Sequence, residues 1–184
     1  MSETMEAKHT RVADSLKNDH KYLTFALGDE EYGLEILKVR EIIGYMDITG
    51  VPQTPSHIRG VINLRGRVIP VVDLRTKFGM ATSEVTDQTC IIVVETTDRG
   101  REFCTGIVVD RVQEVLDVRA EDIEPAPEFG ADVDTQFIRG MGKVGDRVKI
   151  LLDIDRVLTG AIEGGTGAEP EGTMFEEPRT NESL

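Results

Sequence analysis

Between positions 21 and 160 the chain consists of short apolar or alternating runs separated by glycine, proline and polar turn residues. The alternation begins at 22–27, is interrupted by the turn sequence Gly28-Asp29-Glu30, and continues over 32–36. A period of two on both sides of a glycine turn predicts a β-hairpin. Residues 37–43 are too few for periodicity to distinguish a short helical turn from another strand.

The same pattern predicts a second hairpin in the first half of the chain. Runs rich in β-branched residues at 60–64 and 68–72 flank Arg65-Gly66-Arg67, and Gly66 can take a positive φ at the tip. Pro70 lies within the return strand and cannot donate a ladder hydrogen bond, so we expect an exposed edge there. Further strands are predicted at 90–95, 102–109 and 112–118, followed by a hairpin over 140–152.

The chain repeats itself. Residues 58–74 match 138–154 without a gap, with six identities in seventeen positions, and 33–42 align with 106–115. We interpret the halves as two copies of one supersecondary unit. Asp73 and Asp153 each precede a short helical pattern that ends at a glycine, which predicts N-capped helices. Many short strands in two similar sets predict an all-β fold of two small antiparallel barrels. Exchange of strands between the copies would leave the same sequence, so that question stays open.

The pattern divides the chain into three parts. Residues 1–20 have few large apolar groups and are expected to form a flexible leader. Residues 21–160 form the ordered domain, with approximate halves 21–85 and 86–160. Residues 161–184 carry six acidic residues and one basic residue, and are expected to form a disordered acidic tail. Neither a secretory signal nor an apolar run of about 20 residues is present, so we expect no direct membrane insertion.

Charge and cysteine usage narrow the function classes. The net charge of -13 opposes binding to nucleic acids, whose affinity rests on phosphate neutralisation. Cys90 and Cys104 both fall in predicted strands, which is typical of buried thiols in a reducing cytoplasm.

The sequence offers no cluster of catalytic or metal-binding residues. His9 and His20 lie in the leader, and His57 aligns with Phe137 of the second copy, which favours a packing role. The cysteines lack the spacing of zinc ligands, and the paired aspartates are explained as helix caps. We therefore expect no catalytic residue, no metal site and no cofactor.

Positions at which the two copies differ are candidates for function. Arg65 corresponds to Gly145 and Pro70 to Ile150. An exposed arginine at a hairpin tip can contact a partner carboxylate, or it can be an ordinary solvated side chain; the pattern leaves both open. Arg59 is kept as Arg139, which favours a structural role such as pairing with a nearby acid.

Several separate motifs, in order, resemble the CheW family of bacterial chemotaxis coupling proteins. They are the stretches 25–36, 39–42, 60–66, 69–75 and 106–110. The resemblance covers about residues 22–160 and implies two five-stranded barrels packed around a shared hydrophobic groove, with no catalysis. It implies a cytoplasmic adaptor, recruited to membrane-associated receptor arrays. Its partners would be the regulatory domain of the histidine kinase CheA and the cytoplasmic tips of methyl-accepting chemoreceptors.

Carried over by motif, the resemblance implies partner-binding roles for Val39, Glu41, Arg59, Gly60 and Arg65. Three alternatives remain at this stage. The residues could serve receptor or kinase contact without a fixed division between the two. The chain could be a regulatory scaffold of a different chemosensory-type kinase pathway. It could also be a small enzyme with a site between the barrels, which would require buried titratable groups in a cleft.

Overall fold

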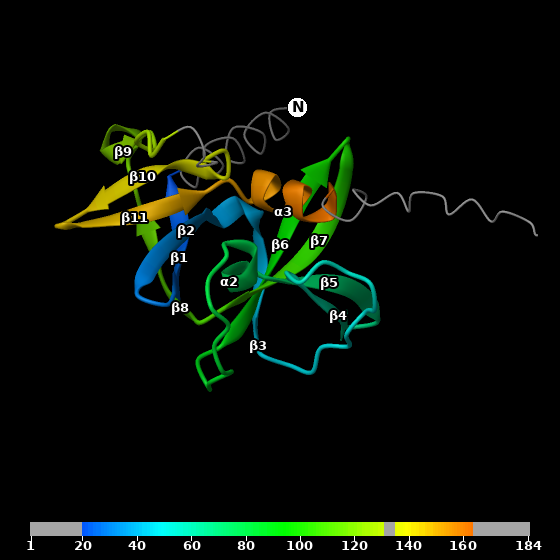
Figure 1. The fold of residues 1–184 in the computed structure, drawn as a ribbon. Helices are drawn as coiled ribbons and strands as arrows, with labels where there is room; N and C mark the ends of the chain where they lie inside the picture. Colours follow the sequence, from blue (N-terminus) through cyan, green and yellow to red (C-terminus); the bar gives the residue numbers. More distant parts are fainter. Residues whose placement is uncertain (1–19, 131–134, 164–184) are drawn as a thin grey trace, which may run out of the picture.

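The computed structural model describes residues 20–130 and 135–163, arranged as two β-sheets with two short helices between them (Figure 1). The strands are β1 Lys21–Leu27, β2 Glu30–Glu35, β3 Val39–Gly44, β4 Ile58–Leu64, β5 Arg67–Asp73, β6 Cys90–Asp98, β7 Arg101–Val109, β8 Arg111–Asp117, β9 Ile123–Glu124, β10 Ile138–Val144 and β11 Arg147–Leu152. The helices are α2 Leu74–Lys77 and α3 Ile154–Glu163, with 3-10 turns η1 Ile36–Lys38 and η2 Ala120–Asp122. The all-β prediction is confirmed, and the ambiguous stretch 37–43 contains both a helical turn and a strand.

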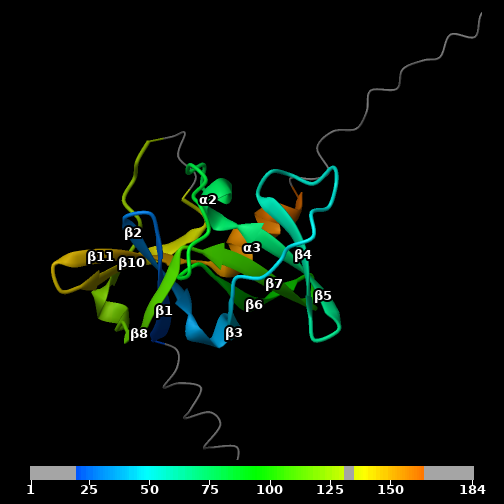
Figure 2. The same ribbon diagram turned by 90° about the horizontal axis from the view of Figure 1, so that it is seen from below.

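The two halves of the sequence exchange strands. The first sheet has the order β8-β1-β2-β11-β10-β9, and the second has β3-β6-β7-β5-β4. Each sheet therefore combines the opening hairpin of one half with the closing hairpin of the other half (Figure 2). This arrangement answers the question that the sequence left open.

One parallel pair joins the halves within each sheet. Strand β11 runs parallel to β2 with Leu151 opposite Gly33, and β5 runs parallel to β7 with Val71 opposite Gly106. The expectation of purely antiparallel sheets is therefore wrong for these two pairs. Strand exchange is the reason, because each crossover brings a closing hairpin alongside a strand from the other half.

The prediction of an exposed edge at Pro70 is confirmed. Strand β5 pairs with β7 only over Val71–Asp73, whereas in the other sheet the parallel ladder already includes Ile150, the counterpart of Pro70. Proline lacks the N–H that this ladder would need. The residues of β5 before Val71 consequently have a ladder on one side only.

The two predicted aspartate caps are present. Asp73 Oδ1 accepts hydrogen bonds from the backbone N–H groups of Arg75, at 3.0 Å, and Thr76, at 3.4 Å. Asp153 Oδ1 accepts one from Arg156 N at 3.3 Å. Helix α3 runs three residues past Gly160, into the range where a disordered tail was expected. The remainder of that tail and residues 1–19 of the leader lie outside the described residues.

Apolar side chains from both sheets and both helices form one shared core. Fifteen residues with exposures of 0–8% form this core. They are Leu23, Phe25, Leu27, Tyr32, Leu34, Val72, Leu74, Ile92, Val94, Ile107, Val109, Leu152, Ile154, Val157 and Leu158. Phe78 and Phe137 pack against it and stack on each other with ring centroids 5.1 Å apart. The copy difference between His57 and Phe137 thus falls at a packing position, at least for the phenylalanine.

Two charged contacts connect the sheets through the helices. Arg75 of α2 donates to both carboxylate oxygens of Asp110, at 2.8 and 2.5 Å, and Gly28 N donates to Asp110 Oδ2 at 2.7 Å. In the other copy, Lys38, one residue after the counterpart of Asp110, has its Nζ 2.8 Å from Asp155 Oδ2 of α3, and Thr97 N donates to Asp155 Oδ1 at 3.2 Å. We call these contacts the two helix clamps. The helix supplies the cation in one clamp and the anion in the other.

The Asp110 clamp makes stability depend on pH. Hydrogen bonds from Arg75, together with the Gly28 N–H, hold the pKa of Asp110 below its ordinary value of 3.8. A depressed carboxyl pKa contributes stability above the unfolded-state pKa, and this contribution is lost as pH falls through the folded-state value. Asp110→Asn should therefore lower the free energy of unfolding by about 2 kcal/mol at pH 7. The difference from wild type should shrink below about pH 4.

Urea unfolding at a series of pH values measures this effect. The exposed Asp117 is the matched control, and Asp117→Asn should change the unfolding free energy by less than about 0.5 kcal/mol. A loss for Asp110→Asn that is equal at pH 7 and pH 3 would contradict the assignment of the effect to the ionised carboxylate.

Candidate docking site

A hollow opens in the second sheet between strand β3 and the β4–β5 hairpin. Its volume is about 380 Å³. The lining residues are Arg40, Glu41, Leu64, Arg65, Arg67, Ile69, Val93 and Cys104. Leu64, Ile69, Val93 and Cys104 give it an apolar floor, while three arginines and one glutamate lie around it. We call it the second-sheet hollow.

Two of the residues proposed from sequence meet at this hollow. Arg65 Nη1 and Nη2 donate to the two carboxylate oxygens of Glu41, each at 2.8 Å. This is the bidentate geometry in which guanidinium and carboxylate bind most strongly. The side chain of Arg65 is 74% exposed and that of Glu41 is 27% exposed, so the pair stays accessible from solvent. It connects edge strands β3 and β4, which no ladder joins among the described residues.

The backbone at Arg65 adopts a conformation that favours glycine. Its φ is +52°, and its counterpart Gly145 has φ +61°. A side chain in the left-handed region costs free energy that glycine avoids. The second copy avoids this cost, whereas the first copy retains an arginine that pairs with Glu41. This contrast, together with the pairing to Glu41, keeps Arg65 as a candidate for partner contact.

The equivalent place in the first sheet is occupied by an ion pair. The counterparts of Ile69 and Cys104 are Lys149 and Glu31, and the ammonium group of Lys149 is hydrogen-bonded to the Glu31 carboxylate. Gln113 Nε2 donates to the same carboxylate at 2.7 Å. Both hydrogen bonds lower the pKa of Glu31, and the bond from Lys149 has the larger effect. Lys149 is only 6% exposed. The two copies therefore carry an apolar hollow at one position and a buried ionic contact at the other.

The remaining sequence candidates lie elsewhere. Val39 is half-buried and packs against the shared core. Arg59 and Gly60 lie near the opposite end of β4 from Arg65, roughly 20 Å away at about 3.3 Å per residue. The structure thus brings together Glu41 and Arg65, and it separates Arg59 and Gly60 from them.

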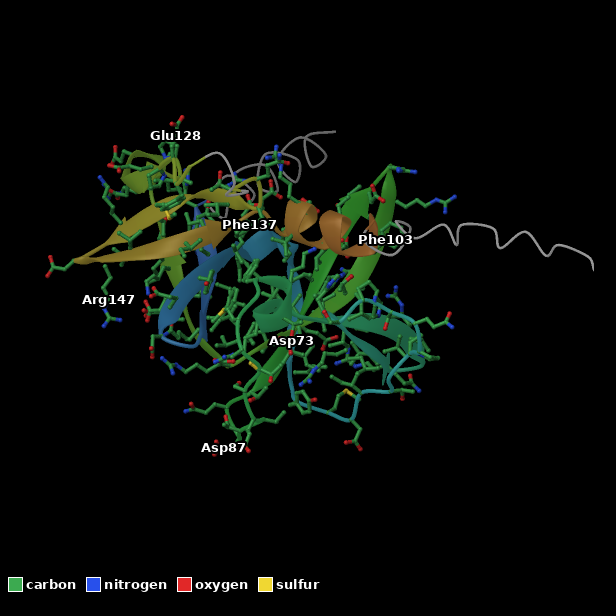
Figure 3. All side chains as sticks on the ribbon, viewed as in Figure 1. Asp73, Asp87, Phe103, Glu128, Phe137 and Arg147 are labelled. Atoms are coloured by element: carbon green, nitrogen blue, oxygen red, sulfur yellow. The ribbon has the colours of Figure 1, made fainter. Side chains whose placement is uncertain are left out.

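Arg59 and Gly60 have structural roles that their counterparts share. Arg59 Nε lies 3.6 Å from Asp73 Oδ2, near the junction of the two sheets where Figure 3 labels Asp73, and Arg139 Nη1 lies 3.0 Å from Glu35 Oε1. The predicted pairing of both arginines with acids is confirmed. Gly60 has φ +142°, and a Cβ atom there would lie 2.0 Å from the carbonyl oxygen of Thr49. Only glycine fits beside the Thr49–Val61 bridge.

Six residues of the hollow were not identified from sequence. Arg40, Leu64, Arg67, Ile69, Val93 and Cys104 follow ordinary strand alternation. One signal was available, because apolar Ile69 aligns with a lysine in an otherwise similar hairpin. Arg67, by contrast, is kept in the second copy as Arg147, which Figure 3 labels at the outer end of the β10–β11 hairpin.

The described residues contain no group of three or more His, Cys, Asp and Glu side chains that could hold a metal ion. Within the same residues, none of the helices is long and apolar enough to cross a membrane. Burial raises the pKa of the Cys90 thiol. The hollow offers an apolar floor with charged side chains around it.

Comparison with known proteins identifies the class of domain. Residues 21–161 match the family described as CheW-like domain. The chain therefore belongs to the CheW-like domain family.

Individual relatives cover most of the chain. The chemotaxis protein CheW of Klebsiella aerogenes is 45% identical over 139 residues, which are 76% of this chain and 81% of the relative. The chemotaxis protein CheW of Helicobacter pylori is 33% identical over 162 residues, covering 86% and 95%. The crystal structure of the scaffolding protein TtCheW from Thermoanaerobacter tengcongensis is similar with a TM-score of 0.67 and 37% identity, covering 76% of this chain and 92% of that one.

The close approach at Gly60 gives a stability prediction. Gly60→Ala should lower the free energy of unfolding by about 3 kcal/mol, because the new methyl group meets a backbone oxygen and φ lies in the left-handed region. Chemical denaturation measures the loss.

Gly44→Ala is the matched control, since a Cβ atom at Gly44 meets nothing within 4 Å. It should leave stability within about 0.5 kcal/mol of wild type. A Gly60→Ala protein that keeps full stability but loses partner binding would instead place Gly60 in a contact surface.

Proposed function

We propose that this chain is a non-enzymatic chemotaxis adaptor that couples methyl-accepting chemoreceptors to the histidine kinase CheA. Membership of the CheW-like family, with relatives named as chemotaxis and scaffolding proteins, supports the adaptor class. The single structural observation that carries the proposal is the second-sheet hollow with its accessible Arg65–Glu41 pair.

The composition of the hollow suits a protein partner. Its floor of Leu64, Ile69, Val93 and Cys104 can receive an apolar side chain, and its arginines can bind carboxylates around that side chain. Arg40 is paired with Glu95 at 2.6 Å, and Arg65 is paired with Glu41. A partner carboxylate would therefore meet guanidinium groups already held in place.

The proposal places the adaptor in the cytoplasm, at arrays of membrane receptors. Its kinase partner would be the regulatory domain of CheA. Its receptor partner would be the cytoplasmic tip of a methyl-accepting chemoreceptor. A pull-down with both fragments tests the coupling. Binding to neither fragment would contradict it, and binding only to another chemosensory-type kinase would favour the alternative pathway.

Charge reversal at the hollow tests the proposed contact. Arg65→Glu should weaken binding of at least one fragment by about tenfold or more, because it removes a guanidinium and places two carboxylates side by side. Isothermal titration against each fragment measures the change, and the circular dichroism spectrum should be unchanged.

Two further variants distinguish a partner contact of Arg65 from a role in holding β3 and β4 together. The double variant Arg65→Glu with Glu41→Arg restores the internal pair with its charges exchanged. Binding that stays weak in the double variant assigns Arg65 to the partner contact, whereas full recovery assigns it to holding β3 and β4 together. Arg99→Glu is the matched control, because Arg99 occupies the same kind of Arg-Gly turn, at φ +48°, in the β6–β7 hairpin. It should bind as wild type does.

A further inference from the structure

The second-sheet hollow carries one guanidinium group whose charge is not paired. Arg40 is paired with Glu95 at 2.6 Å, and Arg65 is paired with Glu41 at 2.8 Å. The side chain of Arg67, the third arginine of the lining, has no hydrogen bond or ion pair to any residue that the structure describes. The whole chain has a net charge of -13, so this unpaired cation does not result from a basic composition.

The first copy shows what the counterpart of Arg67 faces. That counterpart is Arg147, whose Nη1 lies 3.9 Å from Glu31 Oε1. The same carboxylate is bound by the ammonium group of Lys149, and it accepts a hydrogen bond from Gln113 Nε2 at 2.7 Å. In the first sheet, a carboxylate of the chain itself therefore lies beside the arginine.

The second copy retains the arginine but lacks the carboxylate. Cys104 stands at the position of Glu31, and its side chain is shorter and carries no acidic group. Ile69 stands at the position of Lys149, so no ammonium group is present there either. The hollow of about 380 Å³ opens at this place, since Cys104, Ile69 and Arg67 all line it.

We propose that Arg67 binds a carboxylate of the protein partner, and that this carboxylate takes the place in the second sheet that Glu31 takes in the first. The inference rests on the proposed function, to which it adds the chemistry of the partner. The docking segment has an acidic side chain that reaches Arg67, next to an apolar group that covers Ile69. Guanidinium–carboxylate hydrogen bonds are short and about twice as strong as those between neutral groups.

Arg67 is favoured over the other two arginines because it can bind a carboxylate without breaking an internal pair. A carboxylate bound through Arg40 or Arg65 would have to share the guanidinium group with Glu95 or Glu41. Arg67 therefore supplies the main contact, and the two paired arginines contribute positive charge beside it.

Cys104→Glu tests this placement without any partner, because it supplies the carboxylate from within the chain. The introduced carboxyl group should titrate at a lower pH when Arg67 is present than in the double variant with Arg67→Gln, since a nearby cation favours the ionised form. Carbon-13 chemical shifts of the carboxyl group measure both titrations. Equal titration with and without Arg67 would overturn the proposal, because Arg67 would then not reach this place.

Isothermal titration against the CheA regulatory domain and the receptor tip fragment tests the contact itself. Arg67→Gln should weaken binding of one fragment about tenfold and reduce the salt dependence of that affinity, because a charge-assisted contact is lost. Cys104→Glu should weaken binding of the same fragment, since its own carboxylate takes the place of the partner's. Arg147→Gln is the matched control and should bind as wild type does, because Arg147 lies beside Glu31 of its own chain.

The outcomes for Arg67 and for the adaptor function can be told apart. If the wild-type chain binds a fragment and Arg67→Gln binds it equally well, the role of Arg67 is wrong and the adaptor function stands. Equal weakening by Arg67→Gln and Arg147→Gln would also overturn the role of Arg67, because the effect would then follow from overall charge. A wild-type chain that binds neither fragment contradicts the adaptor function, and the titration of Cys104→Glu still decides whether Arg67 accepts a carboxylate here.

Discussion

The two parallel ladders that cross between the halves are the constraint on which the rest of the structure depends. Each ladder requires a glycine on the receiving strand. A Cβ atom at Gly33 would lie 2.8 Å from Leu151 Cδ2 of the crossing strand. One at Gly106 would lie 3.4 Å from Val71 Cγ2 of the crossing strand and 2.8 Å from Ile91 Cγ2 of the neighbouring strand β6. These buried neighbours have little room to move. Because each sheet takes strands from both halves, neither half can complete a sheet alone, and the shared core draws on both halves.

The helix clamps follow from the same crossovers. Each closing hairpin ends at a capping aspartate, so α2 and α3 begin where one half passes into the other. Arg75 then meets Asp110 from the opposite half, and Asp155 meets Lys38. The reversed charge order shows that the two copies have diverged in residues while retaining the type of contact. Each helix residue, Arg75 or Asp155, finds an opposite charge on the linking segment of the other half, although Lys38 lies one residue beyond the counterpart of Asp110.

Sequence patterns predicted the local structure well, because hairpins, caps and turn glycines depend on neighbouring residues. Asp73 and Asp153 illustrate this, as does Gly66 with its φ of +84°. Strand exchange was not predictable, because the alternation in each strand is the same whichever hairpin it joins. Arg65 could be identified from its mismatch with Gly145, but its partner could not. Glu41 lies 24 residues away, and the two meet only after the sheet brings β3 near the β4–β5 hairpin. Lys149 looks like a solvated strand residue in the sequence, and its burial depends on Glu31 in a strand from the other half.

The difference between the two copies favours docking of a partner on the second sheet of the proposed adaptor. An apolar partner side chain that enters the second-sheet hollow would contact Ile69, Val93 and Cys104, which carry no charge. The same side chain at the equivalent place in the first sheet would have to separate Lys149 from Glu31. Separating this largely buried ion pair would leave the Lys149 ammonium without its carboxylate partner, which costs free energy. In the proposed adaptor, that penalty would discriminate against docking on the first-sheet copy. A fold built from two similar units can therefore present one apolar docking point, provided that the other unit fills its own with charge.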